Sequence, residues 1–236
     1  MKRLFGGLAL VAVLVGVTAL PAAAQIHGNV VWGTNPGPGV TLYGDFATGL
    51  NDDAKGFSGE TPTYFGGRAE LGLPIFSVWA GYGSFNPGGD DVSSSSAFGG
   101  GLGFNLIKGP MVPVIVTLEA GVGYLQETVM SVDYKTLNVP IGARVGINIP
   151  TTGVGIKPWI TPRLQIVNEG PDGGTETTVG FGIAGGLAIQ LPVGLGIQAA
   201  LDWQTLKPEG AEESWSPLML GAGLYYRISV PSLGVM

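Results

Sequence analysis

The sequence predicts an all-β fold, a closed antiparallel up-and-down transmembrane β-barrel, and three observations support this prediction. Apolar residues alternate with small, polar or charged residues in ten segments, and a period of two is typical of strands with two different faces. Short and long connections alternate between these segments. The chain of 236 residues contains 42 glycines, and its charged fraction of 12% is about half the usual value. We expect ten strands, with eight as the alternative.

The clearest alternation lies in residues 137–147. The odd positions from Leu137 to Ile147 are all apolar, whereas the even positions include Asn138 and Arg144. The apolar face extends over about ten residues, the length that a tilted strand needs to cross a bilayer. The other nine segments with this alternation are residues 40–48, 64–73, 75–85, 98–106, 112–124, 156–166, 178–189, 193–205 and 218–228.

The connections between the segments fall into two classes. Residues 73–74, 107–110, 150–155 and 191–192 form short connections, and residues 51–61, 86–96, 126–135, 168–176 and 207–215 form longer polar ones. Outer-membrane barrels have an even number of strands, short periplasmic turns and longer extracellular loops. Pairing neighbouring segments about the centres of their connections places apolar residues opposite one another. The expected pairs include Leu71 with Phe76, Leu118 with Val145, and Ile147 with Ile156.

The first 24 residues have the features of a secretory signal peptide. They begin with Lys2 and Arg3, continue with an apolar core and end in small residues, so we expect cleavage after Ala24. Residues 25–39 are then a periplasmic lead-in, residues 40–228 the barrel and residues 229–236 a C-terminal tail. Loss of Lys2 and Arg3 would change the net charge from −6 to −8, which argues against nucleic acid as a partner. The chain has no cysteine and therefore no disulfide.

The last segment contains the pattern Gly-x-x-aromatic-x-hydrophobic, at Gly223, Tyr226 and Ile228. With this pattern and its ten alternating segments, the sequence resembles the small bacterial outer-membrane β-barrel proteins, the OmpA-transmembrane and OmpX-like group. Many members end on an aromatic residue in this strand, whereas this chain continues through Ser229–Met236. The resemblance implies an outer-membrane location, contact with outer-membrane lipid and lipopolysaccharide, and delivery by the barrel-assembly machinery. We expect a monomer without cofactors.

The predicted inner face carries four acidic and five basic residues. This lumen charge network consists of Asp45, Arg68, Glu70, Glu119, Arg144, Lys157, Arg163, Asp202 and Arg227. Charges in a confined interior must be paired, because an unpaired buried charge costs several kcal/mol. The expected register places Asp45 beside Arg68 and Glu119 beside Arg144. A filled interior is expected, since barrels of eight strands are already filled by side chains. The inner glycines either make room for long side chains or leave a narrow polar channel.

The predicted long loops are acidic. They contain Asp52, Asp53, Glu60, Asp90, Asp91, Glu127, Asp133, Glu169, Asp172, Glu176, Glu209, Glu212 and Glu213, opposed there only by Lys55, Lys135 and Lys207. A solvated surface explains these carboxylates. The alternative, a divalent-cation site, lacks the spaced ligand pattern that Ca²⁺ loops show, and no metal site is expected.

The sequence offers no candidate for catalysis. Its one histidine, His27, lies in the lead-in, and with no cysteine present a Ser/His/Asp or Cys/His constellation cannot be assembled at the outer rim. We therefore do not expect an enzyme. The function expected is a structural or surface-interaction role in the outer membrane. The first alternative is a narrow passive channel for ions or small polar solutes, and the second is a soluble exported β-sheet binding protein.

Overall fold

The computed structural model describes residues 38–89, 93–109, 112–129, 132–171, 176–207 and 212–229. The predicted signal peptide and its cleavage site, residues 25–37 of the lead-in with His27, and residues 230–236 of the tail lie outside the described residues.

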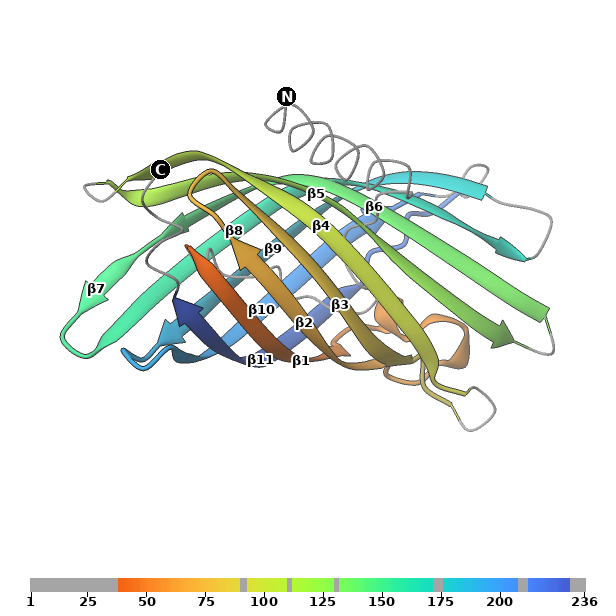
Figure 1. Cartoon of the computed structure of the whole chain (residues 1–236). Helices are drawn as coiled ribbons and strands as arrows, with labels where there is room; N and C mark the ends of the chain where they lie inside the picture. Colours follow the sequence, from red (N-terminus) through yellow and green to blue (C-terminus); the bar gives the residue numbers. More distant parts are fainter. Residues whose placement is uncertain are drawn as a thin grey trace, which may run out of the picture.

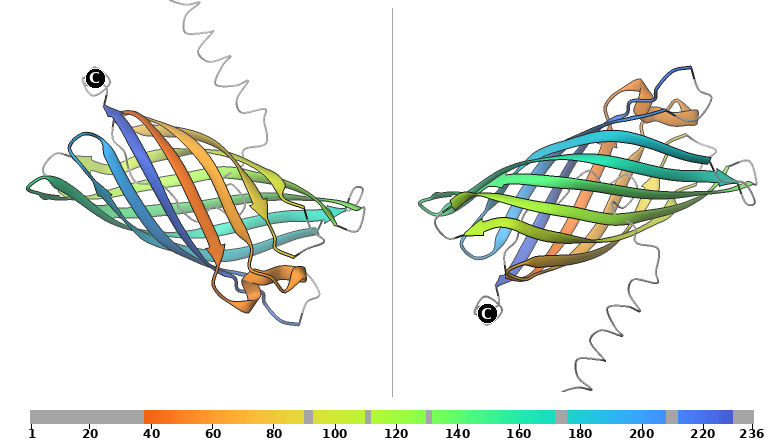
Figure 2. Two further views of the ribbon diagram at one scale, coloured as in Figure 1. Left: turned by 90° about the horizontal axis from the view of Figure 1, so that it is seen from below. Right: turned by 90° about the horizontal axis from the view of Figure 1, so that it is seen from above.

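The described chain forms a closed antiparallel barrel of tilted strands (Figures 1 and 2). The strands are β1 (Gly39–Gly49), β2 (Thr63–Gly72), β3 (Phe76–Asn86), β4 (Ser95–Gly109), β5 (Val112–Val129), β6 (Val132–Ile147), β7 (Ile149–Thr151), β8 (Val154–Pro171), β9 (Glu176–Gln190), β10 (Leu195–Leu206) and β11 (Leu218–Ser229). A 3-10 helix, η1 (Asp52–Ser58), lies between β1 and β2. Strands pair in chain order, and the pairings of β1 with β11 and of β6 with β8 complete the wall. No helix in these ranges is long and apolar enough to cross a membrane.

The predicted strand count was wrong. The described residues form eleven strands and the short helix η1, whereas the sequence predicted an all-β barrel of ten strands, or eight. The extra strand arises because the pairing with β8 is interrupted at Asn148, which ends β6. After Asn148 the chain pairs with β8 again as β7, so that both β6 and β7 pair with β8. The two therefore share one position in the wall, which has ten such positions, and the alternative of eight strands is also wrong.

The predicted registers need a correction of two residues. Leu71 pairs with Val78 rather than Phe76, and Leu118 pairs with Ala143 rather than Val145. Ile156 pairs with Ile149 rather than Ile147. Moving the centre of a hairpin by one residue changes every pair by two, which leaves each side chain on the same face of the sheet. The faces were therefore predicted correctly for these residues although their partners were not.

Two of the predicted long loops are mostly strand. Strands β5 and β6 continue to the pair Val129–Val132, and β8 and β9 continue to the pair Glu169–Glu176. The wall of β5, β6, β8 and β9 therefore extends further than its neighbours at the end of the barrel that carries the longer connections, here called the loop end. The opposite end, with the short connections, is called the turn end.

Alternate residues of each strand face the interior and the exterior. In β1, Thr41, Tyr43 and Asp45 are buried, while Leu42 and Phe46 are exposed on the outer face. This alternation places polar and small side chains inside and apolar ones outside.

Hydrogen bonds connect the two segments that flank the β1–β11 seam at the loop end. Asn51 caps η1: its Oδ1 accepts hydrogen bonds from the Ala54 N–H at 3.1 Å and the Leu218 N–H at 2.9 Å. Its Nδ2 donates to the Ser216 carbonyl at 2.9 Å. Asp53 Oδ2 accepts from the Ser216 N–H at 2.9 Å. Figure 2 shows η1 in orange beside the blue segment that precedes β11.

We predict that Asn51→Ala destabilises the barrel by about 1–3 kcal/mol, because it removes a helix cap and two bonds across the seam. Urea unfolding of the protein folded into lipid vesicles, followed by tryptophan fluorescence, measures this loss. Lys55→Ala is the control, because its ion pair with Asp52 is at the surface and such pairs contribute little. Equal effects of the two substitutions would contradict the assigned role of Asn51.

Candidate functional site in the barrel lumen

All nine predicted lumen residues lie on inward-facing positions of the strands. They form three groups of paired charges and two further cations near the turn end. Six of the nine are buried, among them Asp45 at 1% exposure, Arg163 at 2% and Arg144 at 4%, whereas Glu119, Lys157 and Arg227 are partly exposed. Each group is built from inward-facing residues, because alternate residues of each strand face the lumen.

The first group joins β1, β2 and β10. Arg68 Nε donates to Asp45 Oδ2 at 3.3 Å, and Gln198 Nε2 donates to Asp45 Oδ1 at 3.0 Å. The Tyr43 hydroxyl donates to Glu70 Oε2 at 2.9 Å. The Arg68 guanidinium carbon also lies 4.0 Å from the centroid of the Tyr43 ring, a distance that suits a cation–π contact. One arginine therefore holds a carboxylate and an aromatic ring in place.

The second group crosses β9 to connect β8 with β10. Arg163 Nη2 lies 2.6 Å from Asp202 Oδ1 and 2.9 Å from Oδ2. Arg163 Nε donates to Gln165 Oε1 at 2.8 Å, and Gln165 Nε2 donates to Gln204 Oε1 at 2.6 Å. Charge-assisted bonds of this length are the strong class of protein hydrogen bonds.

The third group is the pair of Arg144 and Glu119, whose Nη2 and Oε1 are 2.8 Å apart. The sequence predicted that the two residues are register partners. Instead Arg144 pairs with Thr117 and Glu119 with Gly142, so that the ion pair is diagonal. The Asp45–Arg68 pair is diagonal as well, because Asp45 is the register partner of Gly66 and Arg68 that of Tyr43. Diagonal neighbours on one face lie within reach of long side chains.

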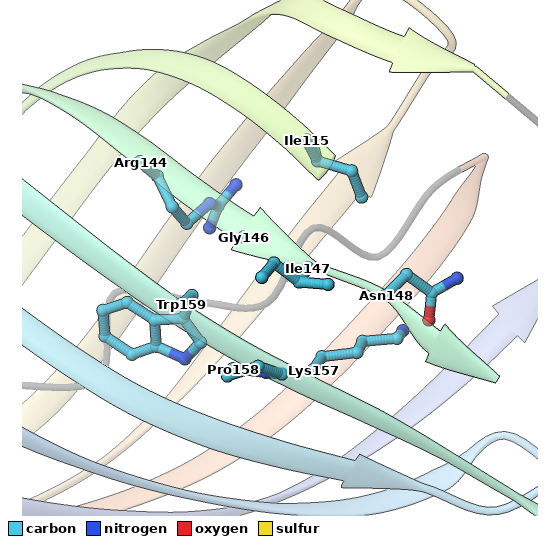
Figure 3. Close-up of a pocket in the computed structure, with 8 residues that line it drawn as sticks. All are labelled: Ile115, Arg144, Gly146, Ile147, Asn148, Lys157, Pro158 and Trp159. Atoms are coloured by element: carbon cyan, nitrogen blue, oxygen red, sulfur yellow. The ribbon is translucent and has the colours of Figure 1, made fainter. Parts of the chain in front are cut away.

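The remaining two cations lie near the turn end. Lys157 Nζ donates to Gln190 Oε1 at 2.6 Å, and Arg227 Nη2 donates to the Pro38 carbonyl at 3.4 Å. Lys157 lies at the start of β8 and lines one small cavity together with Arg144 (Figure 3), whereas Arg227 lies at the end of β11.

The ion pairs Arg68–Asp45, Arg144–Glu119 and Arg163–Asp202 follow the wall. Inner glycines make this possible. A Cβ added at Gly182 would lie 2.8 Å from Arg163 Cζ, and one at Gly223 would lie 2.5 Å from Asp45 Oδ1. These two glycines therefore make room for long side chains that lie along the sheet, which is the first of the two roles considered for inner glycines.

The predicted lumen charge network did not include several polar residues that complete it. Tyr43, Gln165, Gln198 and Gln204 complete the hydrogen-bonded groups, and their inward parity was the available signal. An apolar cluster at the loop end was also missed; its buried residues are Ala47, Tyr64, Phe85, Ala97 and Leu125. The tyrosine ring lies over Gly66 and Gly83, where a Cβ would clash with it.

The acidic residues predicted for the long loops are spread over different structures. Asp52 is paired with Lys55 at 2.7 Å, which lowers the pKa of Asp52. Asp133 accepts a hydrogen bond from the Thr128 hydroxyl at 2.7 Å within the extended β5–β6 hairpin. Asp90, Asp91, Asp172 and Glu209 lie outside the described residues. In the described ranges no three histidine, cysteine, aspartate or glutamate residues are grouped so that they could hold a metal ion.

The fold and the lumen define a class: a closed antiparallel β-barrel with an apolar outer face and paired charges inside. No protein-family model matches the chain, and no curated protein matches it. Three solved structures are similar to it.

The outer membrane protease OmpT from Escherichia coli is 10% identical, with a TM-score of 0.41 over 81% of this chain and 94% of that chain. The N-terminal β-barrel domain of Pseudomonas aeruginosa OprF is 16% identical, with a TM-score of 0.33 over 80% of this chain and 99% of that one. Neisserial surface protein A (NspA) is 14% identical, with a TM-score of 0.39 over 80% and 97%.

We predict that Gly182→Ala destabilises the barrel by about 1–3 kcal/mol, because the new methyl group must displace the Arg163 guanidinium from Asp202. Gly185→Ala on the same strand is the control, since a Cβ there is 3.7 Å from the nearest atom, the Trp159 carbonyl oxygen. Urea unfolding in vesicles compares the two variants. A loss at position 185 as large as that at position 182 would contradict the proposed role of Gly182.

The Glu119–Arg144 pair predicts non-additive effects on stability. Glu119→Gln or Arg144→Gln alone leaves one buried charge without this partner, a change that costs about 3–5 kcal/mol in known cases. The double variant should lose less than the sum of the two single losses. A double-mutant cycle of unfolding free energies measures the difference, and additive losses would show that the two side chains are not coupled.

Proposed function

We propose that this protein is an outer-membrane β-barrel, exported through a cleaved signal peptide, with a charge-filled lumen and a structural or surface-interaction role. The observation that carries the proposal is the apolar outer face of the described barrel. Phe65 is 71% exposed there and Leu224 62%, within a band of exposed apolar side chains contributed by strands all around the wall. Monomeric soluble proteins rarely expose such a large continuous apolar surface. A bilayer covers this surface without a second protein layer.

Aromatic side chains near both ends of the outer face support the same proposal. Toward the loop end these exposed residues are Phe46, Phe65, Tyr82, Phe98, Phe181 and Trp203, and toward the turn end they are Phe76, Phe104 and Tyr226. Outer-membrane barrels carry two girdles of aromatic residues at the membrane interfaces. The alternative, a soluble exported binding protein, does not explain why exposed aromatic residues gather near both ends of the outer face.

The lumen supports a structural role over transport. Asp45 with Arg68, Glu119 with Arg144 and Asp202 with Arg163 form ion pairs, and all six residues except Glu119 are buried, which favours a filled interior. A narrow passive channel is the second candidate, because the pairs follow the wall and do not bridge it. If the role is surface interaction, the extended β5–β6 and β8–β9 hairpins and the η1 segment form the surface that contacts partners outside the cell. Outer-membrane lipid, lipopolysaccharide and the barrel-assembly machinery are the partners we propose, and a monomer is the proposed state.

We predict that Val145→Arg destabilises the barrel in a bilayer by about 1–4 kcal/mol, because a lipid-facing charge is costly and its cost rises toward the membrane midplane. Val145 is 39% exposed on the outer face of β6, and Val145→Leu is the apolar control. Heat-dependent mobility in detergent gels shows whether each variant folds, and urea unfolding in vesicles gives the free energies. If arginine is tolerated as well as leucine, or if the mature protein is soluble without detergent, the membrane proposal fails.

Conductance in a planar bilayer distinguishes the two candidate functions. A filled barrel should show little or no steady current. Replacing Arg68, Arg144 and Arg163 together with alanine should open a cation-preferring leak, since Asp45, Glu70 and Glu119 remain. Gel mobility establishes that the triple variant is folded. If the unaltered protein already conducts with a selectivity set by these charges, the protein is a channel.

A further inference from the structure

The extended wall of β5, β6, β8 and β9 continues past the apolar band at the loop end. On its outer face the register partners Ile166 and Val179 are the last apolar pair between β8 and β9. The next outward pair is Asn168 and Thr177, which are joined by a side-chain hydrogen bond of 3.1 Å. Because a polar outer face is suited to water and not to lipid, this part of the wall lies outside the membrane-spanning segments.

Three carboxylates occupy the inner face of this part of the wall. Glu169 on β8 and Glu176 on β9 are register partners, and partners of this kind have β-carbons about 5 Å apart. Glu127 lies on β5, which β6 separates from β8, and two strand spacings amount to roughly 10 Å. The three side chains therefore form a row across the inner wall, here called the acidic face.

The acidic face has no cation of its own. Within the described ranges Glu127, Glu169 and Glu176 form no ion pair. Lys135 belongs to the same hairpin as Glu127, but as the register partner of Gln126 it lies on the outer face. The sequence stretches 90–92, 110–111, 130–131, 172–175 and 208–211, which lie outside the described ranges, contain no lysine, arginine or histidine.

The carboxylates of this face act on one another. Burial, together with the charge of Glu169, raises the pKa of Glu127. Burial, together with the charge of Glu176, raises the pKa of Glu169. Like charges that face one another on a sheet are destabilising, and a bound cation would offset both the burial and the repulsion.

Two acceptor atoms on the inner face have no hydrogen-bond partner among the described residues. They are Oε1 of Glu127 and Oδ1 of Asn138, and both atoms are buried. Asn138 is 6% exposed, and as the register partner of Val167 it lies diagonally from Glu169. Since both atoms require a donor, they indicate a ligand with several N–H groups.

The acidic face suits an organic cation better than a metal ion. No group of three carboxylates in the described part of the chain could hold a metal ion. Tyr134 is the register partner of Glu127 on the inner face and is 42% exposed. An accessible aromatic ring attracts ammonium groups through cation–π contacts. A row of separated carboxylates beside such a ring matches ammonium groups that are separated along a chain.

We propose that the acidic face binds a linear oligoamine, with one ammonium group between Glu169 and Glu176 and another at Glu127 and Tyr134. The inference rests on the proposed surface-interaction role and adds a ligand class to it. The amine N–H groups also supply donors for Glu127 Oε1 and Asn138 Oδ1. Charge-assisted hydrogen bonds are strong in a partly buried site of this kind.

Calorimetric titration of the full mature protein in neutral maltoside detergent, at constant ionic strength, tests the proposal. Spermidine is the probe, and Mg²⁺ and trilysine are the comparisons. Spermidine should bind saturably, and neither comparison should bind as tightly. Glu169→Gln should weaken spermidine binding about tenfold or more, because a hydrogen bond to a charged group is lost. Tyr134→Leu should weaken it about threefold, because a cation–π contact is lost.

Asp133→Asn is the matched control. Asp133 pairs with Thr128 on the outer face of the same hairpin, so this substitution removes one negative charge without changing the acidic face. It should leave spermidine binding unchanged. Heat-dependent gel mobility establishes that all variants are folded barrels. Saturating spermidine should also shift the urea midpoint of the unaltered protein upward, but not that of Glu169→Gln.

Several outcomes would overturn the proposal. No saturable binding of spermidine, or equal weakening by Asp133→Asn and Glu169→Gln, would leave only a general attraction to an acidic surface. Equally tight binding of Mg²⁺ would indicate a layer of counterions, and equally tight binding of trilysine would indicate a basic peptide as the partner. The membrane proposal stands in each case if the protein still requires detergent and migrates as a folded barrel, whereas loss of both properties would remove the membrane proposal itself.

Discussion

The structure depends on the requirement that backbone N–H and C=O groups in the wall find partners within the sheet. In hydrocarbon no water replaces a missing partner, and each unsatisfied group costs several kcal/mol. The eleven register pairs between β1 and β11 meet this requirement where the ends of the barrel come together. Closure brings Asn51 and Ser216 into contact although they are 165 residues apart in the sequence. The hydrogen bonds of Asn51 therefore stabilise the β1–β11 seam, on which closure of the barrel depends.

Closure in turn limits the interior, and the limited space explains the inner composition. A guanidinium and a carboxylate can be buried together only if each finds its partners in the low-dielectric interior. Arg163 does so by lying along the wall over Gly182, with Asp202 on the next strand but one. The glycine, the arginine and the aspartate form one structural unit, because a side chain at position 182 would push the cation away from its carboxylate.

The faces of the strands could be predicted from the sequence, but their partners could not. Facing depends only on the parity of a residue, and parity is visible as alternation from Leu137 to Ile147. Register depends on the centre of each turn, which composition does not reveal, and an error of one residue there changed Leu71's partner from Phe76 to Val78. The ion pairs Asp45–Arg68 and Glu119–Arg144 still form, since long side chains reach diagonal neighbours. The β5–β6 extension was mistaken for a loop because the segment from Gln126 to Lys135 has polar residues on both faces and no continuous apolar face.

The prolines of β8 show how a closed wall can contain an irregular seam and remain closed. In an antiparallel sheet alternate residues of a strand bond to opposite neighbours. Pro158 and Pro162 have the same parity, and their missing donors both face β6, where the pairing lapses. The other side of β8 remains in register with β9 from Gly155 to Glu169. The two prolines therefore interrupt the ladder only on the β6 side of β8. The ladder between β5 and β6 lapses in the same way opposite Pro140, which lies on β6.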